Sequence, residues 1–228
     1  CGVMCVGAAN GDGVMASEGE AMAREVEAKF QVESAELFDT IRGVGSVAGY
    51  AMTAGETVPQ RDTYFDTGDA TLLRAGWSLR LREKAGTLLV TFKGPFLDEH
   101  ARVEIEEEIT KAHAAALREG RLRAVASPAV VAALEHVGDA AISASLTVEN
   151  EREAWYLSAG ADGTAGRIKL CFDRVVYTAA RLDGTRGVTH GFELEAELLE
   201  GERAFLTRVA RELATKYHLS PERRSKYQ

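Results

Sequence analysis

The sequence predicts an α+β protein dominated by one antiparallel sheet, which we expect to close into a barrel. Apolar and polar residues alternate with period two in many segments, Gly and Asp residues separate these segments, and helical patterns are fewer. Short turns between the alternating segments favour antiparallel neighbours. The predicted strands are Arg24–Val32, Arg61–Phe65, Trp77–Glu83, Leu88–Lys93, Val103–Ile109, Leu146–Trp155, Arg167–Phe172, Val175–Leu182 and Gly191–Leu198.

Helical patterns occupy four segments, which are Ser34–Ile41, Thr110–Val125, Ser127–Val137 and Glu202–Tyr217. Ser127 and Pro128 are a favourable pair for an N-cap and a first helical turn. Residues 1–21 are small, polar and rich in glycine, so we expect them to form a disordered leader. A single folded domain is therefore predicted over residues 22–228.

The composition excludes several classes of protein. The chain has 228 residues and a formal net charge of −8, so bulk charge does not attract nucleic acid, and no nucleic-acid partner is expected. No apolar run approaches the roughly 20 residues that a membrane-spanning helix needs, so no membrane partner is expected either. Three cysteines are too few for a disulfide framework, which favours a reducing, cytoplasmic location.

Three predicted strands carry two glutamates at alternate positions. The pairs are Glu25 with Glu27, Glu104 with Glu106, and Glu193 with Glu195, and the residues between them are apolar. A solvated face of an amphipathic strand accounts for one such pair easily, but less well for three. Same-face carboxylates two residues apart lie about 6–7 Å from each other, and neighbouring strands would bring further acids closer. Because Mg²⁺ and Mn²⁺ prefer carboxylate oxygens, the pattern favours a divalent metal site.

Basic residues accompany these acids. Arg80 and Arg82 share one face of a predicted strand, and Lys93 ends the next strand. Further candidates in later segments are Arg152, Lys169 and Lys226. Guanidinium groups suit two-point contacts with phosphate, and lysine supplies a mobile point charge. The combination indicates a site that holds a polyphosphate on one side and a metal ion on the other.

These motifs resemble those of the CYTH domain, the family of triphosphate tunnel metalloenzymes. Glu25-x-Glu27-x-Lys29 resembles the signature motif of this family. The resemblance continues through DTYFD at 62–66, GWSLRLR at 76–82, TFKGP at 91–95, Arg102-x-Glu104-x-Glu106, Glu151-Arg152, Asp173-Arg174, Glu193-x-Glu195 and Ser225-Lys226-Tyr227. It covers about nine-tenths of the chain and implies an eight-stranded antiparallel β-barrel with flanking helices, whose tunnel takes up triphosphates.

The resemblance also implies roles for individual residues. The acidic lining, of which a subset binds Mg²⁺ or Mn²⁺, would be Glu25, Glu27, Glu104, Glu106, Glu193 and Glu195. The triphosphate would be held by Lys29, Arg80, Arg82, Lys93, Arg152 and Lys226, and we add Lys169 as a substrate-binding candidate. Asp173 matches a family acid that assists the metal or the attacking water, so the candidate catalytic residues are Glu25, Glu27, Lys29 and Asp173. Glu108 and Glu197 extend the alternation beyond the family pattern.

The expected function is metal-dependent hydrolysis of inorganic triphosphate or a related triphosphate. One alternative is a class IV adenylyl cyclase, in which the 3′-hydroxyl of ATP attacks in place of water. Another is a polyphosphate-binding module without turnover, although six converging carboxylates would not help a pure polyanion binder. CYTH domains are often followed by a helical CHAD domain, so such a domain could follow in a longer chain. The substrate, the metal and the oligomeric state stay open.

Overall fold

The computed structural model describes residues 23–96, 101–160, 166–180, 185–222 and 226–227, without the side chains at 23–25, 96, 101–102 and 180. The predicted leader at residues 1–21 lies outside this description. Among the described residues, no helix has the length and apolar character needed to cross a membrane.

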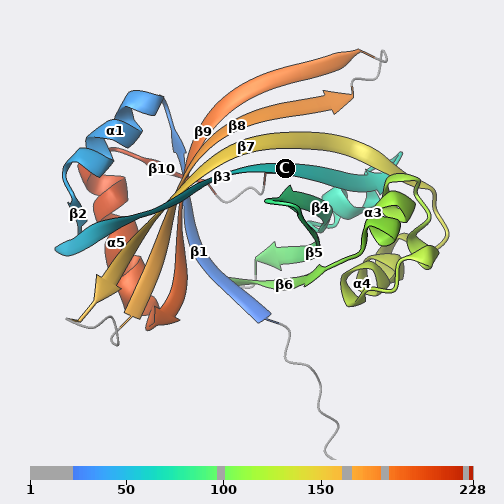
Figure 1. The fold of residues 1–228 in the computed structure, drawn as a ribbon, viewed down its shortest axis with the longest axis horizontal. Helices are drawn as coiled ribbons and strands as arrows, with labels where there is room; N and C mark the ends of the chain where they lie inside the picture. The colour runs from blue at the N-terminus through green and yellow to red at the C-terminus, as the bar shows by residue number, and fades with distance from the viewer. Residues whose placement is uncertain (1–22, 97–100, 161–165, 181–184, 223–225, 228) are drawn as a thin grey trace, which may run out of the picture.

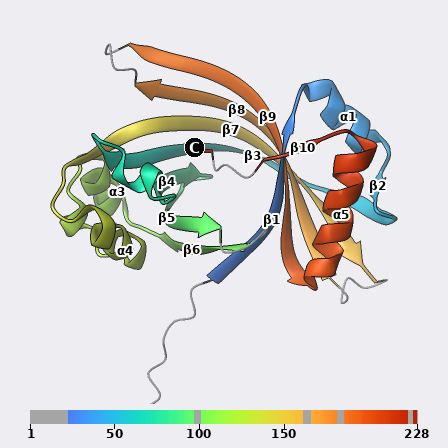
Figure 2. The same ribbon diagram turned by 180° about the vertical axis from the view of Figure 1, so that it is seen from behind.

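A single antiparallel sheet of 10 strands dominates the fold, as predicted (Figure 1). Its strands are β1 (Ala23–Val32), β2 (Ser46–Val47), β3 (Tyr50–Thr67), β4 (Ser78–Lys84), β5 (Thr87–Phe96), β6 (Ala101–Glu108), β7 (Ile142–Ala159), β8 (Gly166–Ala180), β9 (Arg186–Gly201) and β10 (Ser220–Pro221). The strand order is β10-β1-β6-β5-β4-β3-β7-β8-β9, with β2 beside β3 and an additional pairing of β1 with β9. The sheet bends into a half-pipe, and the C-terminus lies on its concave side (Figures 1 and 2).

The prediction that the sheet closes into a barrel is wrong. Strands β6 and β9 both pair with β1, but with different parts of it. Strand β9 pairs with β1 from Glu27 to Val32, whereas β6 pairs with β1 from Ala23 to Val26. The described part of β1 begins at Ala23 opposite Glu104. The rest of β6 therefore has no described partner on that side. The result is a curved sheet with a staggered junction at β1, and it is not closed into a barrel.

The helices cover the outer face of the half-pipe in two groups. They are α1 (Ala35–Gly43), α2 (Thr71–Arg74), α3 (Lys111–Arg118), α4 (Pro128–Val137) and α5 (Arg203–Lys216), with a 3₁₀ turn η1 at Leu122–Ala124. One core cluster packs α1 and α5 against β1, β8 and β9, with Phe38, Phe172 and Leu206 at its centre. A second packs α2, α3 and α4 against β4 and β5, around Leu79 and Val130. Both clusters leave the concave face free for polar side chains.

Strand alternation sorts the side chains between the two faces. Leu79 and Leu81 are fully buried beneath the helices, and Arg80 between them points to the concave side. In β9, Leu194 is likewise buried in the core, while Glu195 lines the concave side. The charged and apolar positions seen in the sequence therefore correspond to the inner and outer faces of the sheet.

Several element boundaries differ from the prediction. The predicted strand Arg61–Phe65 is only the end of β3, because the exposed Gly- and Pro-containing segment before it does not alternate. The predicted helix Thr110–Val125 is split into α3 and η1 at Gly120, whose φ of 74° lies in the left-handed region. Ser127 caps α4 as predicted, and its hydroxyl accepts a hydrogen bond of 3.3 Å from the backbone N–H of Val130.

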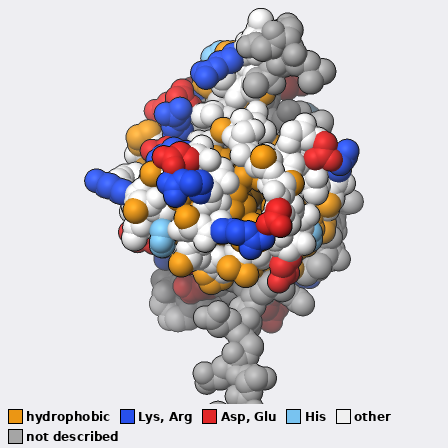
Figure 3. Space-filling view, turned by 90° about the vertical axis from the view of Figure 1, so that its right-hand side faces the viewer, with side chains coloured by type: hydrophobic (Ala, Val, Ile, Leu, Met, Phe, Trp, Pro, Cys, Tyr) orange, Lys and Arg blue, Asp and Glu red, His pale blue; other side chains and the backbone are white. Residues whose placement is uncertain are grey.

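Charged side chains of both signs are interspersed on the end of the molecule that faces the viewer in Figure 3. Interspersed charges give no strong field of one sign on that face. A concentration of positive charge is found instead within the half-pipe.

Candidate functional site

A cavity of 470 Å³ lies on the concave side of the sheet. Eight of its lining residues are basic: Lys29, Arg80, Arg82, Lys84, Lys93, Arg152, Lys169 and Lys226. Five are acidic: Glu27, Glu104, Glu106, Glu195 and Glu197. Strands β1, β4, β5, β6, β7, β8 and β9 all contribute to this lining, as does the C-terminal segment. Residues far apart in the sequence are thus brought to one place by the curvature of the sheet.

The arginines of β4 are held by a carboxylate on the neighbouring strand β3. Asp62 is 1% exposed and accepts two hydrogen bonds of 2.8 Å, from Nε and Nη2 of Arg82. Its Oδ2 also lies 3.4 Å from Nη1 of Arg80, whose Nη2 donates to Thr91 and Glu106 at 3.0 and 3.3 Å. Asp62 takes one N–H from Nε and one from Nη2 of Arg82, so the second N–H of Nη2 and both N–H groups of Nη1 are not used by Asp62.

Burial raises the pKa of Asp62, but the adjacent Arg80 and Arg82 outweigh burial and lower it overall. Asp62 is therefore ionised at neutral pH. It holds the two arginine side chains in a fixed orientation toward the cavity.

A second cluster of charges joins β7, β8 and β9 to the C-terminal segment. Nζ of Lys226 lies 2.8 Å from Asp173, 2.8 Å from Glu193 and 2.7 Å from Glu195. Arg152 donates to Asp173 through Nε at 2.7 Å and also forms an ion pair with Glu195. Lys29 completes the cluster with an ion pair of 2.8 Å to Glu193. Three carboxylates are thus matched by three cations.

The electrostatics of this cluster favour the charged forms of its members. Burial raises the pKa of Asp173, yet Lys226 and Arg152 lower it to below its ordinary value. Burial acts on Glu195 in the same way, and Arg152 and Lys226 hold its pKa well below the ordinary range. Burial lowers the pKa of Lys226, but Asp173 and Glu195 raise it well above the usual value. The cluster is therefore a network of ionised groups at neutral pH.

The remaining cavity cations differ in how they are paired. Lys93 forms an ion pair of 3.1 Å with Glu104, and Lys169 lies 3.7 Å from Glu197. Lys84 follows Arg80 and Arg82 on the same face of β4. Within the described part of the chain, no carboxylate lies within 4 Å of its ammonium group. Among the described contacts, Lys84 is thus a cation of the cavity with no ion pair to break before it binds an anion.

Most of the predicted site residues converge here. All seven predicted substrate-binding residues line the cavity, together with Glu27, Glu104, Glu106 and Glu195. Asp173 and Glu193 lie behind the lining and contact it through Lys226. Glu25 lies on β1, but its side chain falls outside the described residues. Glu197, expected only as an extension of the pattern, also lines the cavity, whereas Glu108 does not contribute to the lining.

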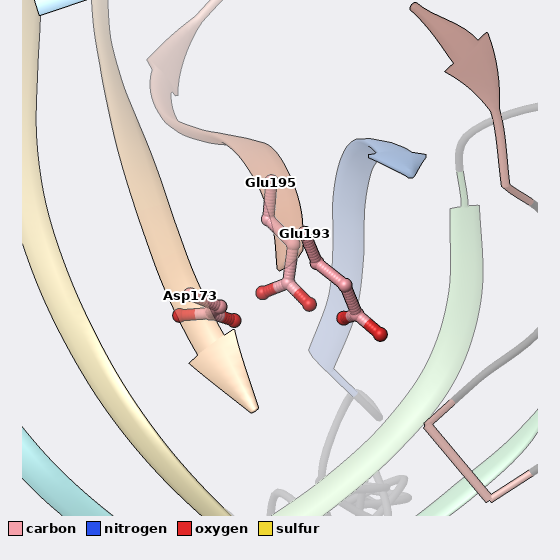
Figure 4. A group of neighbouring side chains, drawn as sticks. All are labelled: Asp173, Glu193 and Glu195. Carbon is pink, nitrogen blue, oxygen red and sulfur yellow. The ribbon is translucent and has the colours of Figure 1, made fainter. Parts of the chain in front are cut away.

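The donor set that best fits a metal ion is the group Asp173, Glu193 and Glu195 (Figure 4). One carboxylate oxygen of each lies within 4.8 Å of the others. All three are buried, and hard oxygen donors of this kind suit Mg²⁺ or Mn²⁺. Among the described residues, Glu27, Glu104 and Glu106 are not part of such a group, although they line the cavity. The chemistry of these three carboxylates therefore fits a divalent ion. In this structure the ammonium group of Lys226 lies between them.

Sequence reasoning missed four residues of the site. Lys84 and Ser78 line the cavity from β4, and Tyr64 lines it from β3. The ring of Tyr64 stacks on Tyr227, with centroids 5.1 Å apart and planes 4° apart. Asp62 was visible only as part of a family motif. Lys84 could have been found by extending the alternation of Arg80 and Arg82 by one further step.

Comparisons with known proteins agree with the fold described above. A structure of a candidate adenylate cyclase from Bacillus halodurans has 22% identity and a TM-score of 0.61, and the match covers 88% of this chain and 94% of that one. A candidate adenylyl cyclase from Hippeastrum, described as having a dominant triphosphatase activity, has 17% identity, a TM-score of 0.62, and coverage of 89% and 93%. At these identities the likeness shows the shared fold. No curated protein sequence matches the chain. The profile of the CYTH domain, however, matches residues 23–228, and the chain therefore belongs to the CYTH domain family.

Proposed function

We propose that this protein hydrolyses inorganic triphosphate with the help of Mg²⁺ or Mn²⁺ and releases orthophosphate and pyrophosphate. The observation that carries the proposal is the cavity itself, where eight cations and five carboxylates share one lining. A linear triphosphate is a compact polyanion, and phosphoryl transfer depends mainly on positioning and charge neutralisation. A lining of this composition supplies both, in a protein of the CYTH family.

The cations of β4 and β5 would hold the phosphates. Arg80 and Arg82 are fixed by Asp62, so little side-chain freedom is lost when an anion binds to them. Lys84 and Lys93 would contact the phosphate oxygens that these arginines do not reach. Lys29 and Arg152, on the facing part of the lining, would enclose the anion from the other side.

The acids would serve the metal and the water. Asp173, Glu193 and Glu195 would hold the ion, which would supply positive charge to oxygens of the scissile phosphoryl group. Glu27, 7% exposed and in the cavity lining, is the candidate to accept a proton from the attacking water. Attack forms one P–O bond and breaks the anhydride P–O bond. Lys29, which lines the cavity, would donate a hydrogen bond to the departing pyrophosphate oxygen.

The name of one similar structure, a candidate adenylate cyclase, favours the cyclase alternative, whereas the Hippeastrum protein is described as having a dominant triphosphatase activity. One substrate panel separates the candidates: tripolyphosphate, ATP and thiamine triphosphate, each with Mg²⁺ or Mn²⁺, scored for phosphate, pyrophosphate and cyclic AMP. The proposal expects phosphate and pyrophosphate from tripolyphosphate, at a kcat/KM higher than for either organic triphosphate. Cyclic AMP as the main product would instead establish the cyclase. Binding without turnover of any compound would indicate a polyphosphate-binding module.

Metal removal tests the acidic part of the proposal. Exhaustive EDTA treatment should abolish turnover, and Mg²⁺ or Mn²⁺ should restore it. Glu27→Gln, which keeps the size but removes the proton acceptor, should lower kcat by about 100-fold or more with little change in KM. Glu119→Gln is the matched control, because Glu119 is exposed and pairs with Arg121 at the surface, outside the cavity lining. Turnover that survives chelation would exclude the proposed metal dependence.

A further inference from the structure

The position that best fits a metal ion is occupied by a side chain of the protein itself. The ammonium group of Lys226 lies within 2.8 Å of all three acids of the donor set, Asp173, Glu193 and Glu195. The lysine side chain is 5% exposed, and that of Asp173 is fully buried. One oxygen of each acid lies within 4.8 Å of the others, which leaves room for one cation among them. Lys226 and a metal ion would therefore compete for the same place.

Charge balance points the same way. The three carboxylates are neutralised by Lys226, Arg152 and Lys29, which all form ion pairs with them. A divalent ion added to this set would leave two surplus positive charges in a buried place, which is unfavourable. Replacement of the Lys226 ammonium by the ion leaves a surplus of only one. Exchange is thus favoured over simple addition.

The structure also gives Lys226 a place to go. Its side chain already lines the cavity, and a lysine has a flexible four-carbon stem. The next residue, Tyr227, is anchored by stacking on Tyr64 and by a hydrogen bond of 2.8 Å from its hydroxyl to Asp66. The side chain of Lys226 can therefore turn into the cavity while the backbone beside it stays in place.

We infer that Lys226 is an exchangeable counter-ion, which neutralises the acidic group in the metal-free protein and is displaced into the cavity when a divalent ion binds. This inference rests on the proposed metal-dependent function, and it adds an order of events. The metal binds first and releases an ammonium group, which can then contact the triphosphate. The acidic group is never left without a cation, and the substrate cavity gains a positive charge only when the metal is present.

The experiment measures Mn²⁺ binding to the full chain by calorimetry without any triphosphate, so its result does not depend on turnover. Lys226→Gln removes the competing ammonium group and should bind Mn²⁺ about 10-fold more tightly than the wild type, or better. Lys169→Gln is the matched control, because Lys169 lines the same cavity but pairs with Glu197 at 3.7 Å, outside the acidic group. Its Mn²⁺ affinity should stay within about twofold of the wild type.

A second readout covers a loss of stability. Lys226→Gln leaves three buried carboxylates with only two cations, so the Tm of the variant should be lower than that of the wild type. Mn²⁺ should raise this Tm again by binding where the ammonium group was. The inference is overturned if Lys226→Gln binds Mn²⁺ no better than Lys169→Gln, if Mn²⁺ does not restore its Tm, or if no variant binds Mn²⁺. Tighter Mn²⁺ binding by Lys226→Gln in a protein that turns over no triphosphate would overturn the proposed function alone.

Discussion

At the scale of single residues, the cations of the cavity are unequal because they differ in what they must give up to bind substrate. Arg80, Arg82 and Lys226 are committed to buried carboxylates, and any phosphate contact has to share them or displace a partner. Lys84 carries no such commitment in the described part of the chain. A free ammonium group at the end of a row of fixed guanidinium groups should contribute its full charge to anion binding.

Lys84→Gln should therefore raise KM for tripolyphosphate by about 10-fold, the lower end of what a charge-assisted hydrogen bond contributes, with a smaller change in kcat. The Tm should not move, because no ion pair is broken. Lys216→Gln is the control, since Lys216 is an exposed lysine near the end of α5, and its ammonium group pairs with Glu212, outside the cavity. Steady-state kinetics and a thermal melt suffice as measurements. An unchanged KM would show that Lys84 does not contact the substrate.

The convergence of the charged strand residues on one site was predictable, because residues of the same chemical kind stand at alternate positions and so share one face of a strand. Alternation puts Arg80 and Arg82 on one face, as it does Glu193 and Glu195, and the structure brings both faces to the same cavity or its immediate wall. The cross-strand partners were not predictable. Nothing in the local pattern says that Asp62 will lie opposite Arg82 and reach Arg80 as well, because that depends on the register of β3 with β4.

At the scale of elements, the C-terminal segment contributes more to the site than its short length suggests. Tyr227 is 9% exposed and packs with Tyr64, Val148 and Val175 on the concave side of the sheet. Its hydroxyl donates to Asp66 at 2.8 Å. Asp66 in turn accepts hydrogen bonds from the backbone N–H groups of Leu72 and Leu73 in α2. One hydroxyl thus joins the last residues of the chain to a strand and a helix far away in the sequence.

Tyr227→Phe should lower the free energy of unfolding by about 1.5–3 kcal/mol, because it removes a buried hydrogen bond to the Asp66 side chain. Tyr217→Phe is a sharp control. The Tyr217 hydroxyl is buried and has no hydrogen-bond partner in the described part of the chain, so its removal should be neutral or stabilising. Urea denaturation of the two variants gives the comparison. Equal effects would mean that the Tyr227 hydroxyl bond does not tie the segment down.

The elements themselves were predictable in kind and less so in extent. The ends of β1, β4, β5 and β6 were predicted within a few residues. The predicted strands Arg167–Phe172 and Val175–Leu182 are instead one strand, β8, and β9 begins at Arg186, before the predicted Gly191. The first half of β3 was not found, because its exposed Gly and Pro residues break the period, and pairing with β7 from Met52 onward supplies the order that the local sequence lacks. Closure of the sheet was predicted from the strand pattern and from the family resemblance, and it is not observed, since β1 divides its residues between β9 and β6.

At the scale of the whole molecule, the net charge of −8 conceals a separation of charge. The outer end face mixes both signs (Figure 3), whereas the cavity gathers eight cations. Buried acids hold five of these cations in place, namely Lys29, Arg80, Arg82, Arg152 and Lys226. Asp62 and Asp173 have exposures of 1% and 0%, respectively. The stability of the fold should accordingly depend on keeping such acids ionised.

The dependence of stability on pH can be measured through Asp62. The charged groups that act on this carboxylate are Arg80 and Arg82 on β4 and Lys226 in the C-terminal segment. The folded state lowers the pKa of this carboxyl group, so the unfolded chain takes up its proton at a higher pH, near 3.9. The stability that Asp62 contributes should therefore be fully present above about pH 5 and be lost as the pH falls through its folded-state pKa. Asp62→Asn should cost about 3–5 kcal/mol at pH 7, since it leaves two buried guanidinium groups without their carboxylate.

The difference in unfolding free energy between wild type and Asp62→Asn should shrink as the pH is lowered from 5 toward 2. Protonation of Asp62 removes its negative charge from the wild type, and the substitution removes the same charge at every pH. Chemical denaturation at a series of pH values measures it. Asp139→Asn is the control, because Asp139 is exposed and its described ion pair is with the exposed Arg123, so it should show little effect at any pH. A difference that stayed constant or grew on acidification would mean that Asp62 does not act as an ionised anchor. The fixed orientation of the β4 arginines would then need another cause, which among their described contacts leaves Thr91 and Glu106 on β5 and β6.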